Sequence, residues 1–146
     1  MRTHGSNPAR VLTAGLVYFA LVFGVGFILG SIRVPFLVPR LGERISELIE
    51  MPCMFVAVLL SARFVARRFS LPMTTSSRLF VGLVALGLLL IAEFLLAVAI
   101  QDRSLGAYIA SRDPISGTVY LAMLVVFGLM PLILARISLA RERYVA

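Results

Sequence analysis

The chain has 146 residues, of which 60% are hydrophobic and 14% are charged, and its mean hydropathy is +1.01. A soluble domain is usually less than half apolar and about a quarter charged, so this composition excludes an ordinary soluble protein. It indicates an integral membrane protein built as one domain over residues 1–146. The net charge of +7 comes from arginine alone. Because no nucleic-acid-binding pattern accompanies it, we expect the lipid bilayer and not nucleic acid to be the partner.

Three of the four expected membrane helices are long uncharged or nearly uncharged runs. Residues 11–32, 79–100 and 116–135 are each long enough to cross a hydrocarbon core of about 30 Å. The second of these runs is interrupted only by Glu93, and the third contains Pro131, where we expect a kink. Asp113 and Pro114 are typical of a helix start, as N-cap and first helical residue.

The remaining membrane helix, residues 46–66, has a shorter apolar run. Only residues 51–62 lie between its last glutamate, Glu50, and Arg63. Twelve helical residues rise about 18 Å, so the helix must include charged residues at its ends to cross the bilayer. We therefore expect a turn at Pro39–Gly42, followed by a helix whose outer end is an amphipathic acidic turn. The fold class is all-α: a four-helix transmembrane bundle.

The arginines are distributed unevenly between the two sides that four crossings would create. Nine arginines and one acid fall on the side of the two termini, and five arginines and five acids on the other. The positive-inside rule then places both termini in the cytoplasm of a bacterial inner membrane. The nine are Arg2, Arg10, Arg63, Arg67, Arg68, Arg78, Arg136, Arg141 and Arg143; the five are Arg33, Arg40, Arg44, Arg103 and Arg112.

A polar cluster is expected in the outer half of the bilayer. Counted along the helices, Glu93 and Glu50 reach a similar depth, and Arg33 ends the first apolar run. An ionised acid in hydrocarbon costs about 2.5–3.5 kcal/mol on insertion scales, so these carboxylates require a partner, water or a proton. Two readings stay open: carboxylates that handle protons or ions, and structural acids paired with arginine. The expected members are Glu93, Glu50, Glu47, Glu43, Arg33 and Arg40, with Arg44 as a further candidate.

Small residues spaced by four mark two helix faces for close packing. Gly26 and Gly30 share a face with Gly15 and Arg33 in the first helix. Ala57 and Ser61 continue the glutamate face in the second. We expect both faces to point into the bundle or toward a partner protein.

No catalytic, cofactor or metal signature is present in the sequence. The stretch "MPCM" offers the soft donors Met51, Cys53 and Met54, but the only histidine, His4, is expected on the opposite side of the membrane. Core packing explains these residues better than metal binding. We expect no cofactor, no metal and no enzymatic activity.

The stretches "GSIRVPFLVPRLGERISELIEMP" and "YIASRDPISGTVYL" resemble a family of small bacterial inner-membrane proteins with four spans. The resemblance covers most of the chain. It implies the four-span architecture and carries no activity.

Two functions fit these observations. The first is a non-enzymatic accessory or interaction protein that associates with itself or with a membrane-protein partner through the small-residue faces. The alternative is a small oligomeric transporter or channel that uses Glu93 and Glu50 as proton- or ion-binding carboxylates.

Overall fold

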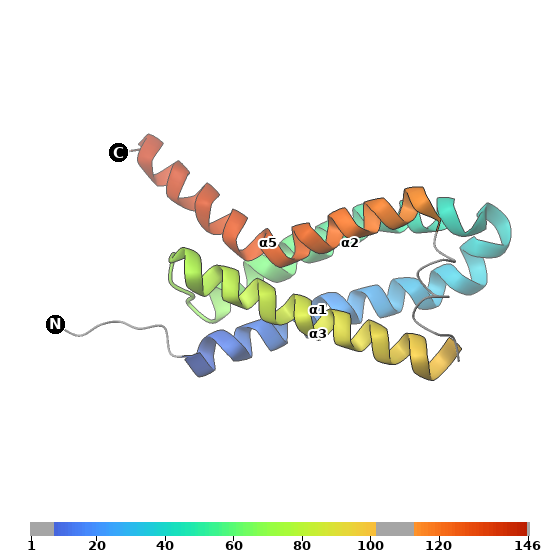
Figure 1. The fold of residues 1–146 in the computed structure, drawn as a ribbon. Helices are drawn as coiled ribbons and strands as arrows, with labels where there is room; N and C mark the ends of the chain where they lie inside the picture. The colour runs from blue at the N-terminus through green and yellow to red at the C-terminus, as the bar shows by residue number, and fades with distance from the viewer. Residues whose placement is uncertain (1–7, 102–112, 146) are drawn as a thin grey trace.

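The structure, a computed structural model, describes residues 8–101 and 113–145, and this part of the chain is almost entirely helical (Figure 1). The expected all-α class is confirmed for these residues. The expected outer-loop charges Asp102, Arg103 and Arg112, like Arg2 and His4, lie outside the described residues. The elements are α1 (Pro8–Ile32), the π-helix η1 (Arg33–Leu37), α2 (Val38–Arg68), α3 (Thr75–Gln101) and α5 (Pro114–Val145).

Three helical segments in the described ranges are long and apolar enough to cross a membrane: Pro8–Arg68, Thr75–Leu96 and Pro114–Arg141. The sequence predicts four. The predicted helices 11–32 and 46–66 both fall in the first segment, because the backbone stays helical through η1. Figure 1 shows that the chain nevertheless reverses there, so that α2 runs back toward the end where α1 begins. The same view places the start of α1 and the end of α5 at one end of the bundle.

The reversal is built from π-helical geometry and one glycine. η1 contains Pro35, whose missing N–H removes a helical hydrogen bond and favours a local change of winding. Gly42 then breaks the helix with φ 79° and ψ 165°, a conformation that L side chains rarely adopt. The predicted turn before the second helix is thus confirmed at Gly42. The buried Ser46 hydroxyl donates a 2.7 Å hydrogen bond to the Gly42 carbonyl and restarts the helix.

Two glycine contacts bring the helices closest together. A Cβ built on Gly82 of α3 would lie 1.8 Å from the Gly128 carbonyl oxygen of α5, so these backbones touch. A Cβ on Gly15 of α1 would lie 2.9 Å from the Val84 side chain of α3. The expected packing role therefore holds for Gly15, whereas the contact between α3 and α5 was not predicted from the sequence.

A buried aromatic pair joins α1 to α5. Tyr18 is completely buried, and its ring stacks on Phe127 with centroids 4.7 Å apart. Its hydroxyl donates a 2.9 Å hydrogen bond to the Phe127 carbonyl. The apolar ring and its satisfied hydroxyl together fix the distance between these helices.

The short connection between α2 and α3 is closed by Arg78. This arginine is 4% exposed, and its guanidinium donates to the carbonyls of Leu71 and Pro72 at 2.9 and 3.1 Å. The sequence suggested only a topology role for Arg78. Its burial gives it a capping role for carbonyls that follow α2.

Asp113 caps α5 as the sequence predicts. Its Oδ2 accepts hydrogen bonds from the backbone N–H groups of Ile115 and Ser116 at 3.1 and 3.0 Å. Its Oδ1 accepts a 2.9 Å hydrogen bond from Nε of Arg44, which ties the start of α2 to the start of α5. The hydrogen bond from Arg44, followed by that from Ser116, lowers the pKa of Asp113 to about 2.

Proline interrupts the backbone hydrogen bonding of α5. Pro131 is buried inside the helix, and Figure 1 shows that α5 bends, with its red C-terminal part leaving the other helices. A proline removes one N–H and its ring presses on the preceding turn, which accounts for the expected kink.

Gly82→Ala is expected to destabilise the bundle. Alanine is favoured over glycine within a helix by about 1 kcal/mol, but here the added methyl group would overlap Gly128, and overpacking costs about 1–3 kcal/mol. The free energy of unfolding, from SDS titration in mixed micelles, should fall. The control is Gly87→Ala on the same helix, where no atom lies within 4 Å. Equal or greater stability of Gly82→Ala would contradict the backbone contact.

Asp113 should make a pH-dependent contribution to stability. Its pKa falls from 3.8 to about 2 on folding, so the contribution is present above about pH 4 and disappears as the pH drops toward 2. Asp113→Asn keeps an acceptor for the cap and removes the charge. The difference in melting temperature between wild type and this variant should therefore be larger near about pH 6 than near about pH 2.

Glu43→Gln, an exposed glutamate of α2, is the control for Asp113→Asn. Wild type and Glu43→Gln should keep the same melting-temperature difference over this range. A pH-independent difference for Asp113→Asn would show that the Arg44 contact does not form.

Candidate functional site

A cavity of about 610 Å³ lies among the described helices and collects most of the expected polar cluster. α1, η1, α2, α3 and α5 all contribute to its wall. It reaches the surface beside residues of α1 and η1 that are exposed, including Phe27 and Val34. The wall is mainly apolar, with Val22, Phe23, Phe27, Met51, Met54, Val58, Leu89, Met123, Leu124 and Phe127.

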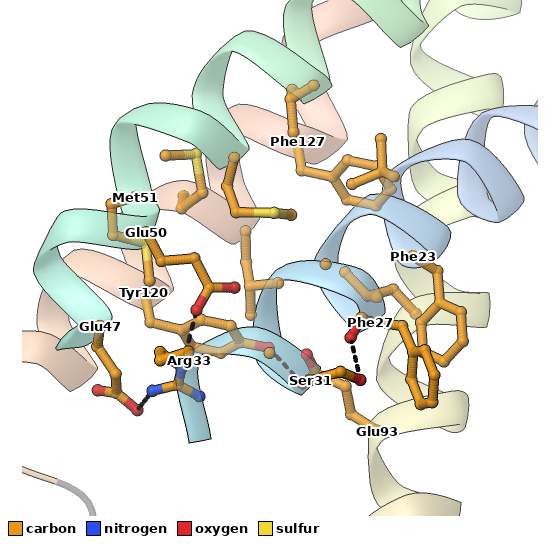
Figure 2. Close-up of a pocket in the computed structure, with 18 of the residues that line it drawn as sticks. Phe23, Phe27, Ser31, Arg33, Glu47, Glu50, Met51, Glu93, Tyr120 and Phe127 are labelled. Atoms are coloured by element: carbon orange, nitrogen blue, oxygen red, sulfur yellow. Dashed lines mark hydrogen bonds and ion pairs between the residues drawn. The ribbon is translucent and has the colours of Figure 1, made fainter. Parts of the chain in front are cut away.

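The charged end of the cavity is organised around Arg33. Figure 2 shows the Arg33 guanidinium between two glutamates of α2. Its Nη1 lies 3.2 Å from Oε1 of Glu47, and its Nε lies 2.8 Å from Oε2 of Glu50. The Nε contact is close in distance, but its direction does not meet the geometry of a hydrogen bond. The side chains of Arg33, Glu47 and Glu50 are only 21%, 16% and 15% exposed, so water screens these ion pairs weakly.

Glu93 lies in the same cavity but has a different partner. The sequence left open whether Glu93 pairs with an arginine; in the structure the Tyr120 hydroxyl of α5 donates a hydrogen bond to Oε2 of Glu93 (Figure 2). Arg33, in η1, pairs with Glu47 and Glu50 of α2. Among the described residues, no cationic group forms an ion pair with Glu93.

Two expected members do not belong to the cluster. Glu43 and Arg40 are both exposed, and neither lines the cavity. Arg40 precedes the break at Gly42, so it does not share the helical face of Glu47 and Glu50. Glu43 does share that face, but it lies one turn earlier, beyond the end of the cavity. Arg44 points instead to Asp113.

The small-residue faces are used differently from expectation. Gly26 and Gly30 line the cavity, and a Cβ on Gly30 would meet no atom within 4 Å. A Cβ built on Gly26 would lie 3.4 Å from Cε of Met54. On α2, Ser61 is buried and Ala57 is half-buried. The outer part of the glycine face therefore leaves room for a cavity, which the close packing of backbones would have removed.

The sequence prediction missed the contribution of α5 to this site. Tyr120, Met123 and Phe127 all line the cavity. Their spacing by three and four places them on one helix face, which is the pattern that could have identified them. Without the structure, nothing in the sequence says which neighbour that face meets.

A metal site finds no support in the described residues. They contain no group of three or more His, Cys, Asp or Glu side chains placed to hold a metal ion. Cys53 is exposed, and Met51 and Met54 lie in the cavity wall.

No protein-family model matches the chain, and no curated protein or solved structure matches it either.

Double-mutant cycles should separate the two parts of the cluster. Arg33→Gln leaves Glu47 and Glu50 facing each other, so it should destabilise the protein, and adding Glu50→Gln should recover part of the loss. We expect this pair to deviate from additivity by about 0.5–3 kcal/mol in SDS titrations. Arg33→Gln and Glu93→Gln should be additive within about 0.5 kcal/mol. Stronger coupling of Arg33 to Glu93 than to Glu50 would refute the observed pairing.

Proposed function

We propose that the protein is a non-enzymatic, multi-pass membrane carrier that binds a small molecule in the central cavity. The observation that supports it is the cavity itself. Its volume of about 610 Å³ falls within the range of about 300–1,000 Å³ found for small-molecule sites. Like such sites, it combines an apolar wall with a few convergent polar groups: Arg33, Glu47, Glu50, Glu93 and Tyr120.

In this proposal Glu93 and Glu50 are the proton- or ion-binding carboxylates. Ionisable side chains within a membrane are expensive to keep there, and such groups commonly mark a pathway for protons or substrate. Glu50 is paired with Arg33, which acts as a fixed counter-charge. Glu93 has the neutral Tyr120 as partner, so its charge is free to respond to what enters the cavity.

The proposed topology has four crossings of a bacterial inner membrane, by α1, α2, α3 and α5. The reversal from Arg33 to Gly42 would lie at the outer face, and both termini in the cytoplasm. This agrees with the arginine distribution, nine against five, and with the antiparallel course of α1 and α2 in Figure 1. The cavity would then open in the outer half of the bilayer.

A second candidate is an accessory protein that acts by association with itself or another membrane protein. Large apolar side chains are exposed along α1, including Leu12, Leu16 and Ile28. In a membrane they face lipid or a partner helix, so they allow an oligomer. The carrier is the better-supported function because an association surface gives no reason for a charged cavity.

Photolabelling in lipid nanodiscs tests the proposed binding. A neutral aryl diazirine should label cavity residues such as Met51, Met123 and Tyr120 saturably, as mapped by peptide mass spectrometry. Gly30→Leu places a side chain in open space within the cavity and should remove most of this labelling. Gly24→Leu is the matched control on the same helix, since its Cβ also meets no atom within 4 Å and it does not line the cavity.

Labelling of lipid-facing residues should rise linearly with probe concentration in all variants, which separates it from the cavity signal. If Gly30→Leu labels like wild type, or if cavity residues never label saturably, the proposed carrier function fails. A stable co-purifying membrane protein together with an unlabelled cavity would support the accessory role.

A further inference from the structure

The charges around the cavity do not balance. Three carboxylates line it, Glu47, Glu50 and Glu93, against one guanidinium, that of Arg33. With all four ionised, the described wall has a formal charge of −2. Arg33 lies within 3.2 Å of both Glu47 and Glu50, so its single positive charge is already shared between them.

Glu93 is where this imbalance is least compensated. The titratable or charged groups of the wall that bear on it come from three elements: Arg33 from η1, Glu47 and Glu50 from α2, and Tyr120 from α5. The described α1 wall consists of apolar side chains, glycines and Ser31. Arg33 is engaged by the two α2 glutamates, and Tyr120 supplies a hydrogen bond without a charge. A cation bound in the cavity beside Glu93 would therefore supply the counter-charge that the described wall leaves to Arg33 alone.

The rest of the wall determines which kind of cation fits. A small metal ion needs several oxygen ligands at short range, and the described residues offer no such group. The wall instead presents aromatic rings, Phe23, Phe27 and Phe127, and the adaptable side chains of Met51 and Met54. Aromatic faces attract cations, and methionine adapts to irregular apolar shapes.

From this charge and this lining we infer that the cavity takes a monovalent lipophilic organic cation, a quaternary ammonium or a protonated amine with an apolar or aromatic body, whose charge is held by Glu93. The inference rests on the proposed carrier function and names its substrate class. The positive charge of the guest pairs with the Glu93 carboxylate, and no covalent bond changes on binding.

The test is equilibrium binding of radiolabelled tetraphenylphosphonium to the full chain in nanodiscs, with empty nanodiscs subtracted. Tetraphenylborate, which has the same shape and the opposite charge, is the comparison probe. We expect saturable binding of the cation at least tenfold tighter than that of the anion.

Variants then assign the charge to Glu93. Glu93→Gln should weaken cation binding at least tenfold, while Glu93→Asp should retain part of it. Glu43→Gln, an exposed glutamate that does not line the cavity, should bind like wild type. Unlabelled benzyltrimethylammonium, a smaller cation, should compete with the probe.

Equal binding of the two probes, or full binding by Glu93→Gln, would overturn the inference. Absence of binding by both cations would also overturn it. Photolabelling with the neutral diazirine separates failure of this inference from failure of the carrier proposal. Saturable labelling of the cavity without a preference for cations would contradict the substrate class only. Absence of cavity labelling would contradict the carrier function itself.

Discussion

The Arg33 guanidinium, held between Glu47 and Glu50, is the interaction on which the charged end of the bundle depends. Arg33 belongs to the π-helical end of α1, and both glutamates belong to the start of α2. These ion pairs form only because the chain reverses between them, at Gly42. Three charges that would each be costly alone in apolar surroundings are thereby brought together. The same contact holds α1 and α2 side by side where the cavity opens.

Because Arg33 pairs with two glutamates of α2, it determines how charge is distributed in the rest of the cavity. Glu93 on α3 has Tyr120 for a neighbour, and its charge meets no described guanidinium. The described wall therefore has one part, around Arg33, in which charges are paired, and another, at Glu93, in which a carboxylate meets a neutral hydrogen-bond donor. An arginine on α5 in place of Tyr120 would have offered Glu93 an ion-pair partner.

Much of the fold follows from local sequence signals. These signals depend on residue spacing within one segment of the chain. They include the helical runs, the Asp113 cap, the Gly42 turn and the polar cluster of Glu50, Glu47 and Arg33. The partner of Glu93 does not follow from such signals, because it depends on how α3 is rotated against α5. For the same reason the Gly82–Gly128 contact and the cavity beside Gly30 could not be predicted: a small residue marks both a close contact and an empty space.

The glycine contacts lie apart from the cavity. Gly15, Gly82 and Gly128 hold the helices together through their backbones, and none of them lines the cavity wall. Phe127 belongs both to the wall and to the core, since it stacks on Tyr18. The wall side chains of Phe27, Met51 and Met123 belong neither to that core nor to the glycine contacts. Exchange of these three for other apolar residues of similar size would therefore reshape the cavity while the bundle persists.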